Sequence, residues 1–135
     1  MNGALNVLVL NGSLKHGNQV SNTEEVVELV LEEMKKHAQI IPEIIRLADK
    51  DIPVGLGFKE SETDEWPAIV EKLKEAHIVI FATPIWWGNR SSLMQRVIER
   101  LDALDEEYLA TGRSALLNKV AGIVITGSED GAQNV

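Results

Sequence analysis

Four short runs of hydrophobic residues divide the chain, and each has the length and composition of a β-strand. The runs LNVLVL and HIVIFAT are almost entirely apolar, which is typical of parallel strands that are covered on both faces. Another run contains Pro42, which has no N–H group for a neighbouring strand, so we expect this strand at an edge of the sheet. The predicted strands are residues 5–10, 39–47, 77–83 and 119–126.

Between these runs, hydrophobic positions recur with the spacing of amphipathic helices. Val27, Val30, Leu31 and Met34 fall on one stripe. Glutamates precede that stripe and lysines follow it, which is the order that the helix dipole favours. The predicted helices are residues 23–37, residues 65–76 with Asp64 as their N-cap, and residues 91–104.

Strands that alternate with helices predict βαβ units and a mainly parallel sheet. Short connections, right-handed crossovers and an edge position for the second strand favour the order 2-1-3-4. This is a flavodoxin-like, three-layer αβα arrangement without its fifth strand. The length of 135 residues suits one domain spanning residues 1–135.

Composition narrows the classes of function. The net charge of −8 argues against nucleic acid as the main partner, and no apolar run is long enough for a membrane span. The chain has no cysteine, which excludes disulfides, thiolate catalysis and cysteine-ligated metals, and is in keeping with a cytoplasmic protein. The three histidines lie far apart without a paired spacing, so we expect no metal site.

Three polar loops follow the first, third and fourth predicted strands. Because the carboxyl ends of parallel strands meet at one edge of the sheet, these loops should lie together, where open α/β sheets bind their ligands. The loops have the sequences NGSLKHGNQVSNT (residues 11–23), TPIWWGNR (residues 83–90) and TGSEDG (residues 126–131).

The first loop matches neither the Walker A pattern nor the GxGxxG fingerprint. It offers Ser13 and Lys15 on one limb, and Ser21, Asn22 and Thr23 at the mouth of a helix, where backbone N–H groups can bind a phosphate. Ser21 and the glutamate three residues later also form a capping-box pattern, which needs no ligand. From this loop alone, both interpretations stay open.

The second loop carries the adjacent residues Trp86 and Trp87. Neighbours on an extended chain point to opposite sides, so at least one ring should reach the surface, where it could contact a planar ligand. The alternative is that one ring packs on the following helix and the other on a neighbouring subunit. The third loop, taken alone, is an ordinary acidic turn.

In order and spacing, the three loops resemble the flavin-binding loops of the NADPH-dependent FMN reductase family, over essentially the whole chain. The resemblance implies an FMN cofactor, NADPH or NADH as electron donor, and hydride transfer through the flavin to a small-molecule acceptor. It assigns the phosphate to Ser13, Lys15, Ser21, Asn22 and Thr23. It assigns the isoalloxazine ring to Pro84, Ile85, Trp86, Trp87, Gly88 and Asn89, and its pyrimidine edge to Thr126, Gly127, Ser128, Asp130 and Gly131.

Two departures from the family pattern change the expectations. The loop at residues 51–63 lacks the cysteine cluster that some relatives carry, which excludes an iron–sulfur centre. The family continues for another helix and a fifth strand, so we expect a chain that is incomplete at its C-terminus, with an exposed fourth strand. A dimer or a strand swap would cover that edge.

Two other functions remain as alternatives. One is an FMN electron carrier that does not react with NAD(P)H, and the other is a flavin-free interaction or oligomerisation module. A phosphoacceptor receiver domain shares the topology, but it needs acidic residues after the first strand, where Asn11 and Gly12 stand.

Overall fold

The computed structural model describes residues 3–135. Its central sheet contains four parallel strands in the order β2-β1-β3-β5, and the two-residue strand β4 pairs antiparallel with the end of β3. The strands are β1 (Leu5–Asn11), β2 (Ile40–Arg46), β3 (Ile78–Trp86), β4 (Asn89–Arg90) and β5 (Val120–Thr126). The predicted order 2-1-3-4 is confirmed, with β5 as the predicted fourth strand, while β4 was not predicted.

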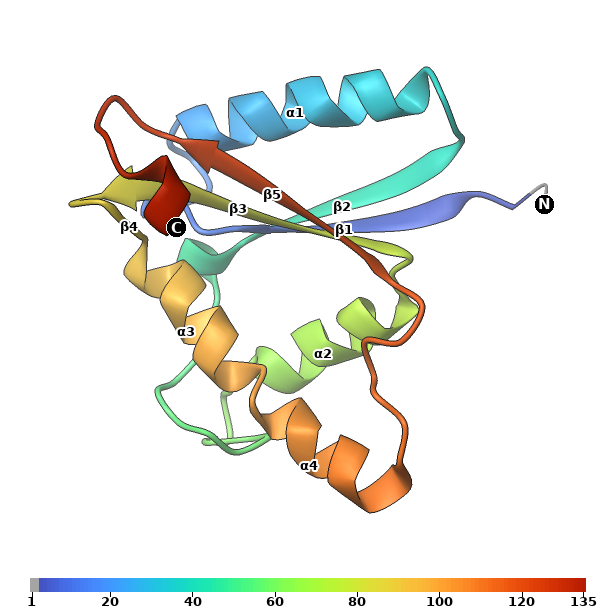
Figure 1. The fold of residues 1–135 in the computed structure, drawn as a ribbon. Coiled ribbons are helices and arrows are strands. Elements are labelled where there is room, and N and C mark those ends of the chain that lie inside the picture. The colour runs from blue at the N-terminus through green and yellow to red at the C-terminus, as the bar shows by residue number, and fades with distance from the viewer. Residues whose placement is uncertain (1–2) are drawn as a thin grey trace.

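Helices cover both faces of this sheet, so the three-layer arrangement is confirmed. Helix α1 lies on one face, and α2, α3 and α4 lie on the other (Figure 1). The helices are α1 (Asn22–Lys35), α2 (Trp66–Glu75), α3 (Ser92–Arg100) and α4 (Ala103–Thr111), with short 3₁₀ turns at Leu47–Asp49 and Ala132–Asn134. No helix within residues 3–135 has the length and apolar character that crossing a membrane requires.

The alternation of side chains along the strands produces two hydrophobic layers. Val7 and Val9 of β1 point toward α1 and pack with Val27 and Leu31. Leu8 and Leu10 of the same strand point to the opposite face. There they join a cluster with Ile45 of β2, Ile69, Val70 and Leu73 of α2, and Val97 of α3. Both faces of β1 are therefore buried, as its uniformly apolar sequence predicted.

The predicted third helix is wrong in extent. Residues 91–104 form one helix only to Arg100, and a second helix begins at Ala103. Helix α4 has just two buried residues, Ala103 and Leu104, and most of it is exposed. Because α4 buries almost no apolar stripe, the hydrophobic pattern contains no signal for it beyond residue 104.

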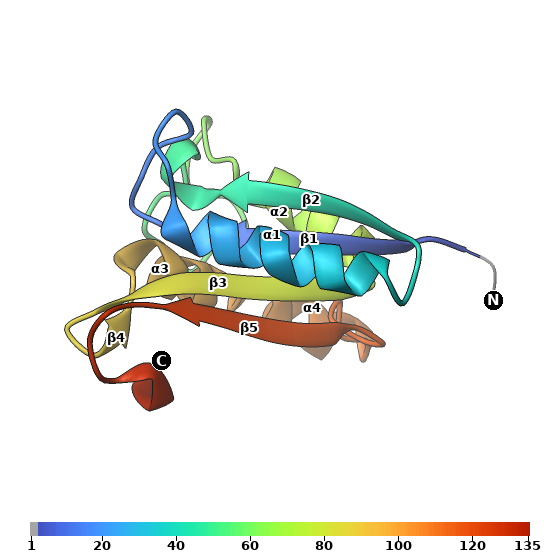
Figure 2. The same cartoon turned by 90° about the horizontal axis from the view of Figure 1, so that it is seen from above.

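The outer strands differ in character. β2 is an edge strand, as Pro42 predicted, and Pro42 lies opposite Val7 of β1. At the other side of the sheet, β5 pairs with β3, and among the described residues no strand lies beyond it (Figure 2). On β5, Val120 is 63% exposed and Ile123 is 68% exposed. The expected apolar edge is therefore present within residues 3–135.

Candidate functional site

The three polar loops converge at the carboxyl edge of the sheet and enclose one pocket of about 470 Å³. The first loop and α1 contribute Ser13, Leu14, Lys15, Asn22 and Thr23; the second contributes Pro84, Ile85 and Trp86; and the third contributes Thr126, Gly127, Ser128 and Glu129. Segments about a hundred residues apart thus share one cavity. The expectation that these loops lie together is confirmed.

Hydrogen bonds with neighbouring residues hold the part of the first loop around Ser13 in place. The Ser13 N–H donates to Oδ1 of Asn11, a fully buried side chain at the end of β1, over 3.0 Å. The Ser13 hydroxyl accepts the N–H of Lys15 at 3.3 Å. This turn leaves the Lys15 side chain exposed at the pocket, where it is the one cationic group among the described lining residues.

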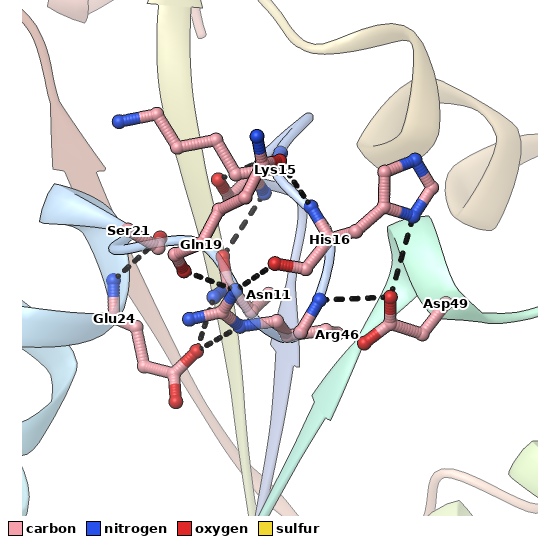
Figure 3. A network of polar contacts seen from close by, with 10 residues as sticks. Asn11, Lys15, His16, Gln19, Ser21, Glu24, Arg46 and Asp49 are labelled. Atoms are coloured by element: carbon pink, nitrogen blue, oxygen red, sulfur yellow. Dashed lines mark hydrogen bonds and ion pairs between the residues drawn. The ribbon is translucent and has the colours of Figure 1, made fainter.

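Ser21 acts as the N-cap of α1 and does not line the pocket. Its hydroxyl accepts the N–H of Glu24 at 3.1 Å, which is the capping interaction that the sequence allowed. The reciprocal half of a capping box is not formed within residues 3–135, because the Glu24 carboxylate instead contacts Asn11 and Arg46 (Figure 3). Asn22 and Thr23, the first residues of the helix, do line the pocket.

The two tryptophans have different environments. β3 extends beyond its predicted end at Thr83 to Trp86, and Trp87 and Gly88 form the turn that leads into β4. Both turn residues have positive φ, 51° and 74°, which is the requirement of a type I′ hairpin turn. Trp86 lines the pocket with about half of its surface exposed, whereas Trp87 is 93% exposed and outside the lining. Gly88 and Asn89 are also outside it.

The third loop closes against this hairpin. Gly131 has a φ of 116°, and a Cβ atom there would lie 2.6 Å from the Cα of Gly88, so only glycine fits this close approach. Oδ1 of Asp130 accepts the N–H of Gly131 at 3.0 Å. Asp130 and Gly131 therefore shape the loop from outside the pocket lining.

Two lining residues, Leu14 and Glu129, were absent from the predicted set. Both lie within the predicted loops, so their position along the chain was the available signal. Glu129 is the one carboxylate among the described lining residues, and it comes from the loop opposite Lys15. Within residues 3–135, no group of three carboxylate or histidine side chains is arranged to hold a metal ion.

Comparison with known proteins places this architecture in a family. Residues 5–135 match the model of the NADPH-dependent FMN reductases. The chain belongs to this family. The resemblance stated from the three loops is therefore confirmed.

Two proteins of similar sequence are informative. The chain is 34% identical to the 8-demethyl-8-aminoriboflavin-5′-phosphate synthase of Streptomyces davaonensis, over 98% of this chain and 54% of that protein. It is 36% identical to the divalent metal cation transporter MntH of Mycobacterium bovis, over 96% of this chain but 19% of that protein. This FMN reductase family chain thus spans about half of the first relative and a fifth of the second.

The fold is also found in a solved structure with a bound flavin derivative. The crystal structure of RosB with its intermediate 8-demethyl-8-formylriboflavin-5′-phosphate superposes with a TM-score of 0.78 at 32% identity. The match covers 98% of this chain and 56% of RosB. The flavodoxin-like fold class is thereby confirmed.

Proposed function

We propose that this chain binds FMN in the pocket between its three loops and acts as an NAD(P)H-dependent oxidoreductase. The observation that carries the proposal is the cavity of about 470 Å³, which has a cationic, hydroxyl-rich end and an aromatic wall. FMN has the matching division into a phosphate and a planar ring. Membership of the FMN reductase family supports the same assignment.

The chemistry of the donor set fits a phosphate at the first loop. The first N–H groups of an α-helix have no partner within the helix, and the side chain of Ser21 satisfies that of Glu24. The N–H groups of Asn22 and Thr23 are therefore available at the pocket, at the positive end of the helix dipole. Lys15 would supply a full positive charge, and Ser13 and Thr23 would supply hydroxyl groups.

The second and third loops fit the flavin ring. Pro84 and Ile85 provide a stiff apolar wall at the end of β3, and Trp86 extends that wall at the mouth of the pocket. Thr126, Gly127 and Ser128 would offer backbone and hydroxyl groups to the polar edge of the ring. Some residues predicted to contact the flavin ring or its pyrimidine edge do not line the pocket, and they would act indirectly by shaping the hairpin and the third loop. These residues are Trp87, Gly88, Asn89, Asp130 and Gly131.

FMN held by these loops would supply the hydride and electron chemistry that links NAD(P)H to a small-molecule acceptor. The residues of this chain would bind and orient the flavin and leave one face of its ring accessible. We assign no side chain as general acid or base. Glu129 would act on the flavin through its charge.

The decisive experiment is anaerobic mixing of the FMN-loaded protein with NADPH or NADH. Loss of the absorbance band of the oxidised flavin would support the oxidoreductase. A protein that binds FMN in equimolar amount but is not bleached by either nucleotide would instead be an electron carrier. A purified protein that takes up no FMN would reject both and favour the flavin-free interaction module.

A second candidate function follows from the Streptomyces davaonensis synthase and from the RosB structure. The name of one and the bound intermediate of the other describe riboflavin-5′-phosphate derivatives that are altered on the ring. The flavin phosphate held by this pocket would then be a substrate that is modified. Mass spectrometry of the flavin recovered after incubation and reoxidation in air separates the two candidates, because a reductase then returns FMN of unchanged mass.

We further propose that the exposed edge of β5 is covered by a second copy, in a dimer. Val120 and Ile123 on that strand expose apolar surface beside unpaired backbone groups, an arrangement that favours association. Sedimentation of the wild type against a Val120→Lys, Ile123→Lys variant tests this proposal.

Since the nicotinamide donor is a cytoplasmic metabolite, we propose the cytoplasm as the site of action.

A further inference from the structure

The phosphate end of the proposed site is formed by a loop that has almost no hydrophobic support. Residues 14–20 are all exposed. A second cavity, of about 380 Å³, lies against the loop and the strand β2, and Gly17, Glu24, Arg46 and Asp49 are among its lining residues. The loop therefore separates two cavities, and packing alone cannot fix its conformation.

Arg46, the last residue of β2, holds the loop by two hydrogen bonds and donates a third to helix α1. Its Nη1 donates to the carbonyl oxygens of His16 and Gln19, at 2.6 and 2.7 Å. Its Nε donates to Oε2 of Glu24 in the first turn of α1 (Figure 3). One guanidinium thus connects the His16–Gln19 turn inside the exposed segment to the first turn of α1. The side chain is only 14% exposed, so water competes weakly for these contacts.

Asp49 anchors the tip of the same loop. Its Oδ1 accepts the N–H of Gly17 at 3.0 Å and lies 3.4 Å from Nδ1 of His16. A Cβ atom at position 17 would lie 2.7 Å from Oδ2 of Asp49, so glycine allows this close approach. Arg46 and Asp49 both come from the carboxyl end of β2 and its following turn, and neither lines the pocket of the proposed flavin site.

We infer that Arg46 and Asp49 are positioning residues that pre-organise the loop for the phosphate of FMN. A loop ordered before binding loses less conformational entropy when the ligand arrives, and this increases affinity. The charge of Arg46 is already neutralised by Glu24, so its effect comes from geometry. The inference rests on the proposed function, because FMN is the ligand whose phosphate the loop would hold.

The test compares FMN with riboflavin, which has the same ring and no phosphate. Arg46→Lys keeps the positive charge but cannot reproduce the forked contacts, and Arg46→Gln removes both. We expect each variant to weaken FMN binding about tenfold or more while riboflavin binding changes less than about twofold, since pre-organisation acts only at the phosphate. Asp49→Ala should produce a smaller change of the same kind.

A matched control is Lys72→Gln. Lys72 lines the same second cavity and pairs with Glu43 of β2, but the structure gives it no contact with residues 13–20. The Lys72→Gln substitution removes one positive charge, as Arg46→Gln does, and should leave the ratio of FMN affinity to riboflavin affinity unchanged. If Arg46→Lys binds FMN as the wild type does, or if the affinities for both ligands fall equally, the positioning role is wrong.

A readout without flavin distinguishes a failure of this inference from a failure of the proposed function. In the ligand-free protein, ¹⁵N order parameters of Gly17 and Gln19 should be near about 0.85 in the wild type and Lys72→Gln, and fall toward about 0.6 in Arg46→Lys. Unchanged values in Arg46→Lys would overturn the inference. Failure of the wild type to bind FMN would reject the proposed function, whereas the order parameters would still decide whether Arg46 orders the loop.

Discussion

The hydroxyl groups of Thr23 and Thr126 lie 2.8 Å apart and share a hydrogen bond across 103 positions of the sequence. Thr23 stands in the first turn of α1, and Thr126 is the last residue of β5. This contact joins the loop proposed for the phosphate to the loop proposed for the polar edge of the ring. The two ends of the pocket are therefore mechanically connected before any ligand binds.

The first prediction concerns the energy of this connection. Thr→Val replaces each hydroxyl by a methyl group of similar size, so either variant removes the hydrogen bond. We expect a double-mutant cycle of Thr23→Val and Thr126→Val to give a coupling free energy of roughly 0.5–1.5 kcal/mol, measured by denaturant unfolding. Pairing Thr23→Val with Thr111→Val at the exposed end of α4 is the control and should be additive. Additivity of the first pair would contradict the connection.

The second prediction separates the two tryptophans. Trp86 lines the pocket and Trp87 is almost fully exposed, so only the first should contact the flavin ring. Trp86→Ala should weaken FMN and riboflavin alike, by about tenfold, because it removes an aromatic contact with the ring they share. Trp87→Ala should change either affinity less than about twofold. Quenching of tryptophan fluorescence on titration with each flavin measures this, and a larger loss in Trp87→Ala would reverse the assignment.

The tryptophans also show how far the sequence could be interpreted. Alternation along an extended chain predicted that at least one ring would reach the surface, and both do. Which of the two rings lines the pocket depends on where β3 ends. β3 continues to Trp86 because its end pairs with both β5 and β4, through Pro84 opposite Thr126 and Trp86 opposite Asn89. The pairing of Pro84 with Thr126 joins distant segments and is not encoded in a local pattern, so the extension of β3 beyond Thr83 could not be predicted from residues 83–90 alone.

Glu24 and Arg46 illustrate the same limit at the first loop. The spacing from Ser21 to Glu24 predicted a capping box, and the Ser21 half of it is present. The Glu24 carboxylate is instead held by Arg46, which lies on a neighbouring strand and far away in sequence. The sheet order and the meeting of the three loops were predictable, because they follow from hydrophobic periodicity and general topology. Contacts of single polar side chains depend on the assembled fold.

The third prediction concerns the reduction potential of bound FMN. Glu129 lines the pocket, and its negative charge would oppose the negative charge that develops on a reduced flavin. Glu129→Gln should therefore raise the two-electron midpoint potential, by on the order of 20 mV for an interaction of about 1 kcal/mol. Spectroelectrochemical titration measures the shift. Glu106→Gln on the exposed face of α4 is the charge-matched control, and a potential that is equal or lower in Glu129→Gln would contradict the assigned effect.

The fourth prediction concerns stability in acid and rests on Asp64 and Arg100, which form an ion pair of 2.7 Å with both side chains fully buried. Burial by itself would raise the pKa of Asp64, but hydrogen bonds from Arg100 and from the N–H groups of Glu60 and Trp66 outweigh it and lower the pKa below its usual value. A carboxyl whose pKa is lower in the folded state stabilises the fold at pH values above its ordinary pKa. This contribution is lost as the pH falls below about 4, toward the lowered pKa.

Asp64→Asn should therefore destabilise the protein strongly at neutral pH, by about 3–5 kcal/mol, because Arg100 stays buried without its counter-charge. The carbonyl oxygens of Pro53, Gly57 and Phe58 would remain as its partners. The free energy of unfolding of this variant should also vary less with pH between about 5 and 3 than that of the wild type. Urea unfolding at a series of pH values measures both effects.

The control is Glu43→Gln, which removes an exposed ion pair with Lys72 and should change the free energy of unfolding by less than about 1 kcal/mol. If Asp64→Asn kept the acid dependence of the wild type, the buried pair would not be the group that titrates.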